Sequence, residues 1–272
     1  MKVGFLQFDP ILLDVEENID EISKIIEGTD SFDLMVIPEL ANSGYIFTEK
    51  KELKKVAEEI PSGFFVNKLS ELAKSKNGYI VSGVCEKKGD IFLNSSVLIG
   101  PEGYISKYRK IHLFNREKLF FQPGDGPFKI YDVRGMKVGL LICWDWIFPE
   151  ATRSLAIQGM DVLAHSVNLV LSFCQDAMIT RSIENQIYTI TSNRTGLETN
   201  KEFSLHFKGN SQVTSPDGKR LAQASIDKNE VQIVNIDLEK SRDKWMSDGN
   251  HIFDDRRPEM YELLTQKKSF KL

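Results

Sequence analysis

The sequence predicts an α/β fold of mixed β-sheets flanked by helices. Helical and strand patterns alternate in the early part of the chain, whereas strands joined by tight turns occupy the middle and the end. Alternating elements favour parallel strand pairs and hairpins require antiparallel pairs, so the sheets should contain both. No low-complexity linker or internal repeat interrupts the 272 residues, and we therefore expect a single domain over 1–272.

The early elements follow from hydrophobic periodicity. Apolar residues recur at helical spacing over 15–27, and the apolar run 34–37 is typical of a buried strand that ends at Pro38. A turn around Gly89 indicates a hairpin. The other elements expected in this part are strands 2–8, 79–85, 91–99 and 104–108, and helices near 49–59 and at 64–76.

The later elements begin with a short apolar strand at 138–142. A helix is expected at 149–158, because Pro149 suits the first turn of a helix. The charged, irregular segment 245–272 is interpreted as a C-terminal tail, either solvated or wrapped around a neighbouring subunit. The remaining elements expected are strands 161–165, 187–192, 211–215, 221–224 and 231–236, and a helix at 176–186.

Composition narrows the class of protein. The hydrophobic content of 41% and charged content of 27% are typical of soluble globular proteins. A net charge of −4 argues against a nucleic-acid partner, and no apolar stretch reaches the roughly 20 residues of a membrane span. Cys85, Cys143 and Cys174 are too widely spaced for a disulfide framework or a zinc motif. We therefore expect a cytoplasmic protein.

The segment 138–150 is the most informative part of the chain. A short apolar run ends abruptly at Cys143, and Trp144 and Asp145 follow before the next helix. A thiol between the end of a strand and a helix can be exposed, and nearby backbone N–H groups can stabilise an anion. A lone free cysteine is more often a buried packing residue, so this position alone leaves both interpretations open.

A thiol nucleophile needs a base, and no familiar arrangement supplies one. Pro149 stands where a phosphatase loop would require arginine, and Leu141 and Asp145 stand where the serine-hydrolase elbow would require glycines. None of the four histidines lies in a recognisable Cys–His signature: His112, His165, His206 and His251.

Charged residues next to β-segments offer an alternative. Glu39 follows the strand 34–37, Lys110 follows the strand 104–108, and Glu117 lies a few residues further on. Each residue alone is more typical of a helix cap, a solvated cation or a surface turn. In α/β sheets, however, ligand-binding groups gather beyond strand ends, and together these residues supply a base, a cation and a thiol.

Three segments resemble the signatures of the nitrilase superfamily of carbon–nitrogen hydrolases, in the same order and at similar spacing. They are Pro38–Leu40, Tyr108–Phe114 and Leu141–Glu150. Further similarity extends the resemblance over nearly the whole chain, at 122–125, 181–185, 209–211, 216–218 and 255–258.

The resemblance implies a four-layer α-β-β-α sandwich, with catalytic residues Glu39, Lys110 and Cys143 and a second glutamate at Glu117. Glu39 would accept the thiol proton, and Cys143 would attack an amide or nitrile carbon. Lys110 and the backbone N–H of Trp144 would stabilise the resulting anion. Water would then hydrolyse a thioester. No metal or organic cofactor is implied.

The resemblance also suggests what surrounds the reacting groups. Tyr45, Asn168, Trp146 and Phe173 are candidate pocket residues, although aromatic residues near strand ends are usually core. Ser166 departs from the pattern, because relatives often carry proline there. The remaining expectations are an ion pair between Glu150 and Arg153, packing roles for Cys85 and Cys174, and a homodimer or higher oligomer with subunit contacts from 245–272.

Three functions stay open. A small amide or N-carbamoyl amine is the first choice of substrate, because amidases and carbamoylases dominate the superfamily and Cys143–Asp145 resembles carbamoylputrescine-type members. A nitrile is the alternative, since Cys143–Trp146 is similar to a Cys-Phe-Asp-Trp form in archaeal nitrilase-like relatives. A catalytically silent binding or regulatory protein is the third, and the presence of Glu39, Lys110 and Glu117 together with Cys143 argues against it.

Overall fold

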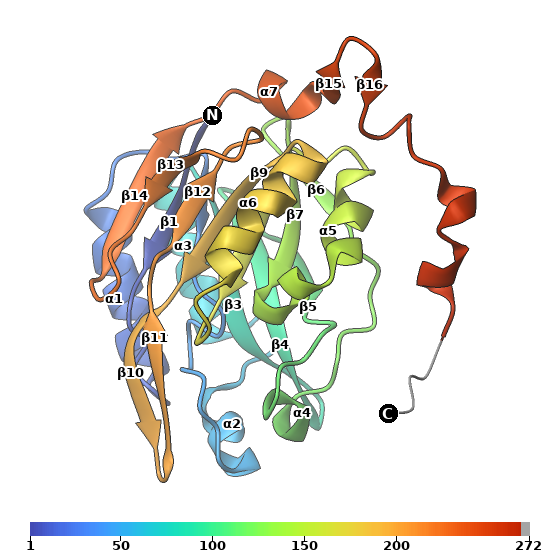
Figure 1. Cartoon of the computed structure of the whole chain (residues 1–272). Helices are drawn as coiled ribbons and strands as arrows, with labels where there is room; N and C mark the ends of the chain where they lie inside the picture. The colour runs from blue at the N-terminus through green and yellow to red at the C-terminus, as the bar shows by residue number, and fades with distance from the viewer. Residues whose placement is uncertain (268–272) are drawn as a thin grey trace.

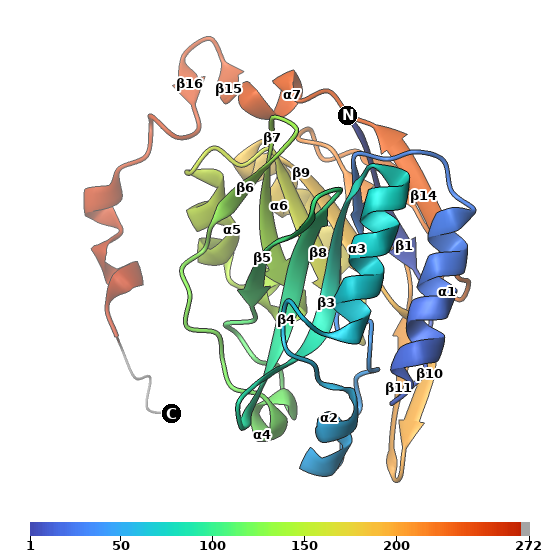
Figure 2. The same ribbon diagram turned by 180° about the vertical axis from the view of Figure 1, so that it is seen from behind.

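The computed structural model describes residues 1–267, and these form two six-stranded sheets packed face to face with helices on both outer surfaces (Figures 1 and 2). This arrangement confirms the α/β sandwich expected from the sequence. The C-terminal part of the expected tail, 268–272, lies outside the described residues.

The first sheet carries both parallel and antiparallel strand pairs. β2 pairs in parallel with β1 and β3, whereas β14, β4 and β5 add antiparallel pairs. The strand order is β14 (Glu230–Asn235), β1 (Lys2–Gln7), β2 (Leu34–Val36), β3 (Tyr79–Lys88), β4 (Ile91–Gly100) and β5 (Gly103–Arg109).

The second sheet is built in a similar way. β7, β8 and β9 are parallel, with antiparallel strands at both edges. The strand order is β13 (Arg220–Gln223), β12 (Gln212–Thr214), β9 (Tyr188–Asn193), β8 (Val162–Val167), β7 (Met136–Ile142) and β6 (Ile130–Val133).

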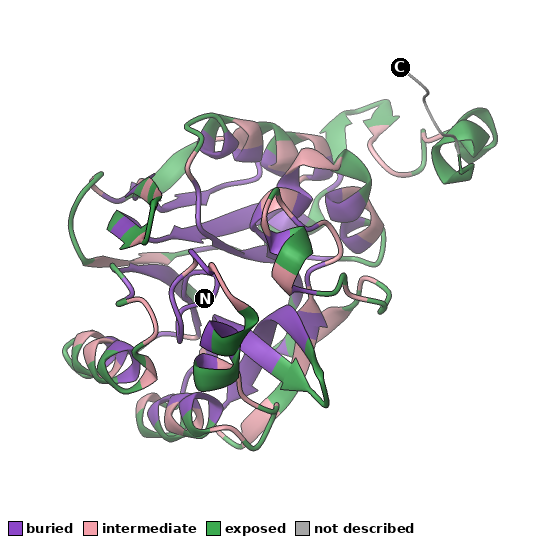
Figure 3. Cartoon of the chain, turned by 90° about the horizontal axis from the view of Figure 1, so that it is seen from below, coloured by how far each residue is buried: buried purple, intermediate pink, exposed green. Residues whose placement is uncertain are grey.

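Helices cover the outer face of each sheet. Helices α1 (Val15–Glu27) and α3 (Phe64–Lys76) lie against the first sheet, and α5 (Pro149–Ala156) and α6 (Cys174–Asn185) against the second (Figures 1 and 2). Buried residues concentrate in the strands and on the inner helix faces (Figure 3). The core between the sheets includes Val3, Val36, Val81, Leu140 and Val162.

Smaller elements gather at one end of the sandwich, where α2 (Lys50–Val56), α4 (Glu117–Phe120) and the hairpin β10 (Thr195–Asn200)–β11 (Phe203–Lys208) lie (Figure 1). The sequence patterns did not predict α4, the hairpin or β6. The chain after β14 continues through α7 (Glu239–Arg242), β15 (Trp245–Ser247), β16 (Asn250–His251) and two 3₁₀ turns, Pro258–Met260 and Glu262–Thr265. No helix in residues 1–267 is long and apolar enough to span a bilayer.

Candidate active site

Cys143 is the first residue of the 3₁₀ helix Cys143–Ile147, directly after β7. Its backbone φ of 40° lies in the left-handed region, which residues with side chains seldom adopt. The fully buried ring of His165 on β8 holds this turn, with Nε2 3.0 Å from the carbonyl oxygen of Cys143. Burial lowers the pKa of His165 to about 4, so a neutral ring donates to the backbone. His165 therefore positions the turn and does not bond the thiol.

Lys110 lies between two carboxylates. Its Nζ is 2.7 Å from Oε1 of Glu39 and 2.7 Å from Oε1 of Glu117. Glu39 and Lys110 are fully buried, and Glu117 is 5% exposed. Burial favours the neutral amine, but the charges of Glu117 and Glu39 outweigh it and raise the pKa of Lys110. The alternatives of a solvated lysine and a surface turn at Glu117 are thus wrong.

Glu39 has one committed carboxylate oxygen and one free oxygen. Oε1 accepts hydrogen bonds from Lys110 and, at 2.7 Å, from Nδ2 of Asn94 on β4. Oε2 is buried and has no hydrogen-bond partner in the described part of the chain. Burial raises the pKa of Glu39 to about 7 against the opposing effect of the Lys110 cation. This carboxyl group can therefore exchange a proton near neutral pH.

Asn168 links the thiol to the glutamate. Its backbone oxygen is 3.9 Å from Sγ of Cys143, and its Nδ2 donates to the backbone oxygen of Glu39 at 2.9 Å. Burial raises the pKa of the Cys143 thiol, and the negative charge of Glu39 raises it further. The thiol is therefore protonated at rest, and its activation requires a base.

The turn after Cys143 is fixed by Asp145. Its fully buried carboxylate accepts the backbone N–H of Ile142 at 3.0 Å and that of His112 at 3.1 Å, and the Tyr108 hydroxyl at 2.8 Å. Trp144 occupies the second position of the 3₁₀ helix, and the first N–H groups of a helix have no partner within it. An oxyanion role for the N–H of Trp144 stays a prediction.

Two cavities adjoin the site. A cavity of about 20 Å³ is lined by Cys143, Trp144, Trp146 and Asn168, and by Cys174. A larger cavity of about 370 Å³ includes Tyr45 and Glu117 but not the nucleophile. Phe114 and Val170 line both cavities, so the larger cavity adjoins the small cavity that contains the thiol.

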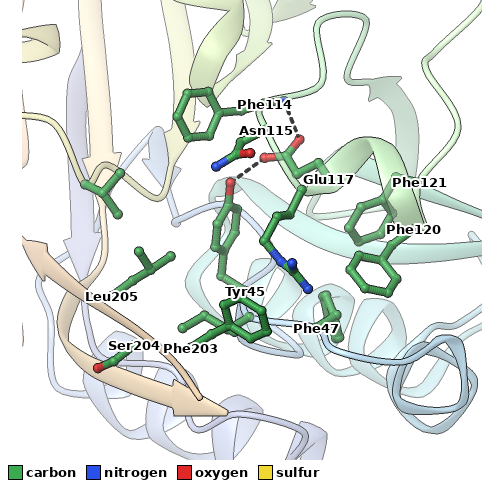
Figure 4. A pocket seen from close by; sticks show the side chains of 13 residues that line it. Tyr45, Phe47, Phe114, Asn115, Glu117, Phe120, Phe121, Phe203, Ser204 and Leu205 are labelled. Atoms are coloured by element: carbon green, nitrogen blue, oxygen red, sulfur yellow. Dashed lines mark hydrogen bonds between the residues drawn. The ribbon is translucent and has the colours of Figure 1, made fainter. Parts of the chain in front are cut away.

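The larger cavity has a mostly apolar wall. Tyr45 and Glu117 lie side by side on this wall, and the tyrosine hydroxyl donates to Oε1 of Glu117 at 2.7 Å (Figure 4). The hairpin contributes Phe203, Ser204 and Leu205 to the wall. Other apolar lining residues are Ile46, Phe47, Phe114, Phe120, Phe121 and Val170.

Two further predictions concern side chains near the site. Phe173 is half exposed and packs against Trp146, with ring centroids 5.8 Å apart, but it lines neither cavity. The expected ion pair between Glu150 and Arg153 is wrong. Arg153 instead donates to the backbone oxygen of Glu184 at 2.7 Å. Cys85 and Cys174 are buried, in agreement with packing roles.

Sequence reasoning missed Asn94 and the role of Asp145. Asn94 interrupts the apolar strand 91–99, and a polar residue at such a place could have signalled a functional contact. The position of Asp145 carried no comparable signal. Across residues 1–267, no group of three histidine, cysteine or carboxylate side chains is arranged to hold a metal ion.

The fold and this site define a hydrolytic enzyme with a cysteine nucleophile. Residues 2–244 match the carbon-nitrogen hydrolase family, and the chain belongs to this family, within the nitrilase superfamily.

Individual relatives carry different activities in their names. The chain is 43% identical over 263 residues to a nitrilase of Pyrococcus abyssi, covering 96% of this chain and 99% of that one. It is 34% identical over 245 residues to an (R)-stereoselective amidase of Pseudomonas sp., covering 88% and 86%. Among solved structures, a carbon-nitrogen hydrolase from Helicobacter pylori G27 is similar with a TM-score of 0.83, at 25% identity and 98% coverage of both chains.

Proposed function

We propose that this enzyme hydrolyses the terminal amide of a small acyl compound through a thioester on Cys143, releasing ammonia. The observation that carries the proposal is the buried Glu39–Lys110 pair beside the thiol. It combines a carboxyl group with a pKa of about 7, a free carboxylate oxygen and a permanent cation.

In the first half of the reaction, Oε2 of Glu39 takes the thiol proton and Sγ of Cys143 forms a bond to the amide carbon. The carbonyl oxygen becomes an anion, which Lys110 and the N–H of Trp144 stabilise. When the carbon–nitrogen bond breaks, Glu39 gives its proton to the departing nitrogen, and ammonia leaves. The acyl group stays on Cys143 as a thioester.

In the second half, Glu39 takes a proton from water, which attacks the thioester carbon. The carbon–sulfur bond breaks, the acid leaves and Cys143 regains its proton from Glu39. Glu117 assists Glu39 by accepting a second hydrogen bond from Lys110, which fixes the position of the ammonium group. Because the Lys110 cation stays between the two carboxylates, Glu39 can gain and lose a proton twice in each cycle.

A nitrile is the second candidate substrate, and the 43% identity to a nitrilase over nearly the full chain favours it. The same thiol and proton donor would act on a nitrile carbon. An N-carbamoyl diamine fits less well. Its distal ammonium would need a carboxylate, and the carboxylate on the described wall of the larger cavity, Glu117, is already bonded to Lys110 and Tyr45.

The test compares an amide, a nitrile and an N-carbamoyl amine of one acyl chain, at matched concentration. Released ammonia and acid are measured, with Cys143→Ala as the control. We expect the amide to turn over and the variant to be inactive. Turnover of the nitrile alone would overturn the amide assignment, and no turnover of any class would favour the silent binding protein.

We also propose that the chain forms one catalytic domain and that its tail contacts a second copy. Several apolar tail residues are exposed, which is unfavourable in a monomer. They include Trp245, Met246, Met260, Leu263 and Leu264. Deleting 245–272 should lower the molar mass measured by light scattering if the tail holds two copies together. An unchanged mass would reject this role.

A further inference from the structure

Arg116 is an unpaired cation on the wall of the larger cavity. It lies directly before α4, and its guanidinium carbon is 3.8 Å from the centroid of the Phe203 ring on the hairpin. Among the described residues, its side chain makes no hydrogen bond and no ion pair. Most other arginines of the structure bond a carboxylate or a backbone oxygen, as Arg109 and Arg194 do.

Glu117, next to it in sequence, does not serve as its partner. Oε1 of Glu117 accepts from Lys110 and Tyr45, and Oε2 accepts the backbone N–H of Phe114 at 3.2 Å. Both carboxylate oxygens of Glu117 therefore already accept hydrogen bonds from other groups. On the described wall of the cavity, Arg116 is the cation whose N–H donors are free to bind an anion that enters.

The rest of the wall suits an apolar chain. Phenylalanine side chains from several segments line the cavity, and the hairpin adds Phe203 and Leu205 (Figure 4). The cavity volume of about 370 Å³ lies in the range of pockets that hold drug-sized ligands, which begins near 300 Å³. It therefore exceeds what an acetamide-sized substrate needs.

We propose that the natural substrate carries a carboxylate at the far end of an apolar acyl chain, and that Arg116 binds this carboxylate. The inference rests on the proposed function, because it places the scissile group at Cys143. The planar guanidinium can give two parallel hydrogen bonds to a carboxylate while keeping its stacking contact with Phe203. Arg116 thus sets the acyl specificity of the enzyme.

The test uses ω-monoamides of linear dicarboxylic acids of increasing length, each compared with an uncharged alkyl amide of equal length. At one length, the intact enzyme should prefer the acid. In Arg116→Met, the ratio of kcat/KM for acid and neutral amide should fall about tenfold to a hundredfold, which is typical of losing a hydrogen bond between charged groups. Arg116→Lys should recover part of the ratio, because it keeps the charge without the planar fork.

Lys118 supplies the matched control. It is an exposed cation on α4, two residues away and outside the cavity, so Lys118→Met should keep the ratio of the intact enzyme. An equal loss for both substrates in Arg116→Met would mean that Arg116 only holds the hairpin. A lack of preference for the acid at every length would also overturn the proposal.

A binding measurement separates this proposal from the proposed function. In Cys143→Ala, calorimetry with the preferred ω-monoamide should show binding that weakens about tenfold or more when Arg116→Met is added. Binding of this kind without turnover by the intact enzyme would contradict the amide chemistry and support the carboxylate site. Binding that does not depend on Arg116 would contradict the site itself.

Discussion

Nζ of Lys110 lies 2.7 Å from Oε1 of Glu39, and neither side chain reaches solvent. Removal of one partner from a buried ion pair leaves an uncompensated charge, which is more costly than the absence of the whole pair. The pair therefore affects both the stability of the protein and its chemistry, and variants can separate the two.

Lys110→Met should abolish most activity. It removes the cation that stabilises the oxyanion in the proposed mechanism, and the expected loss in kcat is about 10²- to 10³-fold, or ~3–4 kcal/mol. It also leaves Glu39 and Glu117 close together without a cation, so Tm should fall. Steady-state kinetics and thermal unfolding measure the two effects.

The double variant Lys110→Met/Glu117→Gln is the control for charge. It removes one negative charge along with the cation, so part of the lost Tm should return while activity stays low. Recovery of activity would show that Lys110 balances charge and does not contact the oxyanion.

The activity should rise with pH through about 7, because Glu39 must be ionised to accept the thiol proton and its pKa is raised to about that value. Asn94 donates to the ionised carboxylate. In Asn94→Leu the ionised form loses this bond, so the pKa of Glu39 should increase and the acid limb of kcat/KM should move to higher pH. Ser96→Ala, on the same strand, is the control, because the buried Ser96 hydroxyl has no partner in residues 1–267. If the acid limb of kcat/KM stays at the same pH in Asn94→Leu, the limb reports the ionisation of a group other than Glu39.

Cys143 should react with a small alkylating agent before Cys174 does. Both thiols line the same cavity of about 20 Å³, and burial raises the pKa of each. In the proposed mechanism, however, Cys143 has a base, Glu39, that takes its proton as it reacts. Mass spectrometry after brief exposure measures the difference. Glu39→Gln should slow modification of Cys143 and leave Cys174 unchanged; equal rates in the intact protein would contradict activation by Glu39.

Glu198 should control activity from the hairpin. Its buried carboxylate accepts the backbone N–H groups of Tyr45 and Ile46 and is paired with the fully buried Arg194. In Glu198→Gln, the guanidinium of Arg194 loses one of its two carboxylate partners and keeps the other, Asp9. The Tyr45 segment loses the charge of the acceptor that holds its backbone N–H. We expect a lower Tm and a severalfold loss of kcat/KM.

Glu202→Gln provides the comparison for this variant. It makes the same chemical change at an exposed position of the same hairpin and should leave both quantities unchanged. Loss of Tm in Glu198→Gln with full activity would limit the role of Glu198 to stability.

Periodicity predicted most helices and most strands of the two sheets, because long apolar patterns report which face of an element is buried. It failed for the hairpin 195–208, whose polar residues bond one another and neighbouring loops. Glu198 and Arg194, for example, bury each other's charge. Composition cannot reveal such pairing, because the partners come together only in the folded chain.

The same limit applies to the site. Order and spacing of motifs placed Glu39, Lys110 and Cys143 correctly in one region, but Lys110 and Glu117 alone looked like surface residues. Their burial depends on three-way pairing with Glu39, which no local pattern encodes. Arg116 was missed because its neighbour Phe203 comes from a hairpin that was itself unpredicted.

Glu39 and Lys110 follow strands of one sheet, whereas Cys143 follows a strand of the other. The distance across which the proton must pass is therefore set by the thickness of the hydrophobic layer between the sheets. A substitution that changes side-chain volume deep in that layer, for example at Val81 or Leu140, would change the separation between Glu39 and Cys143 and so the rate of catalysis. Because protein interiors are close-packed and barely compressible, such a substitution would alter turnover without any change at the reacting groups.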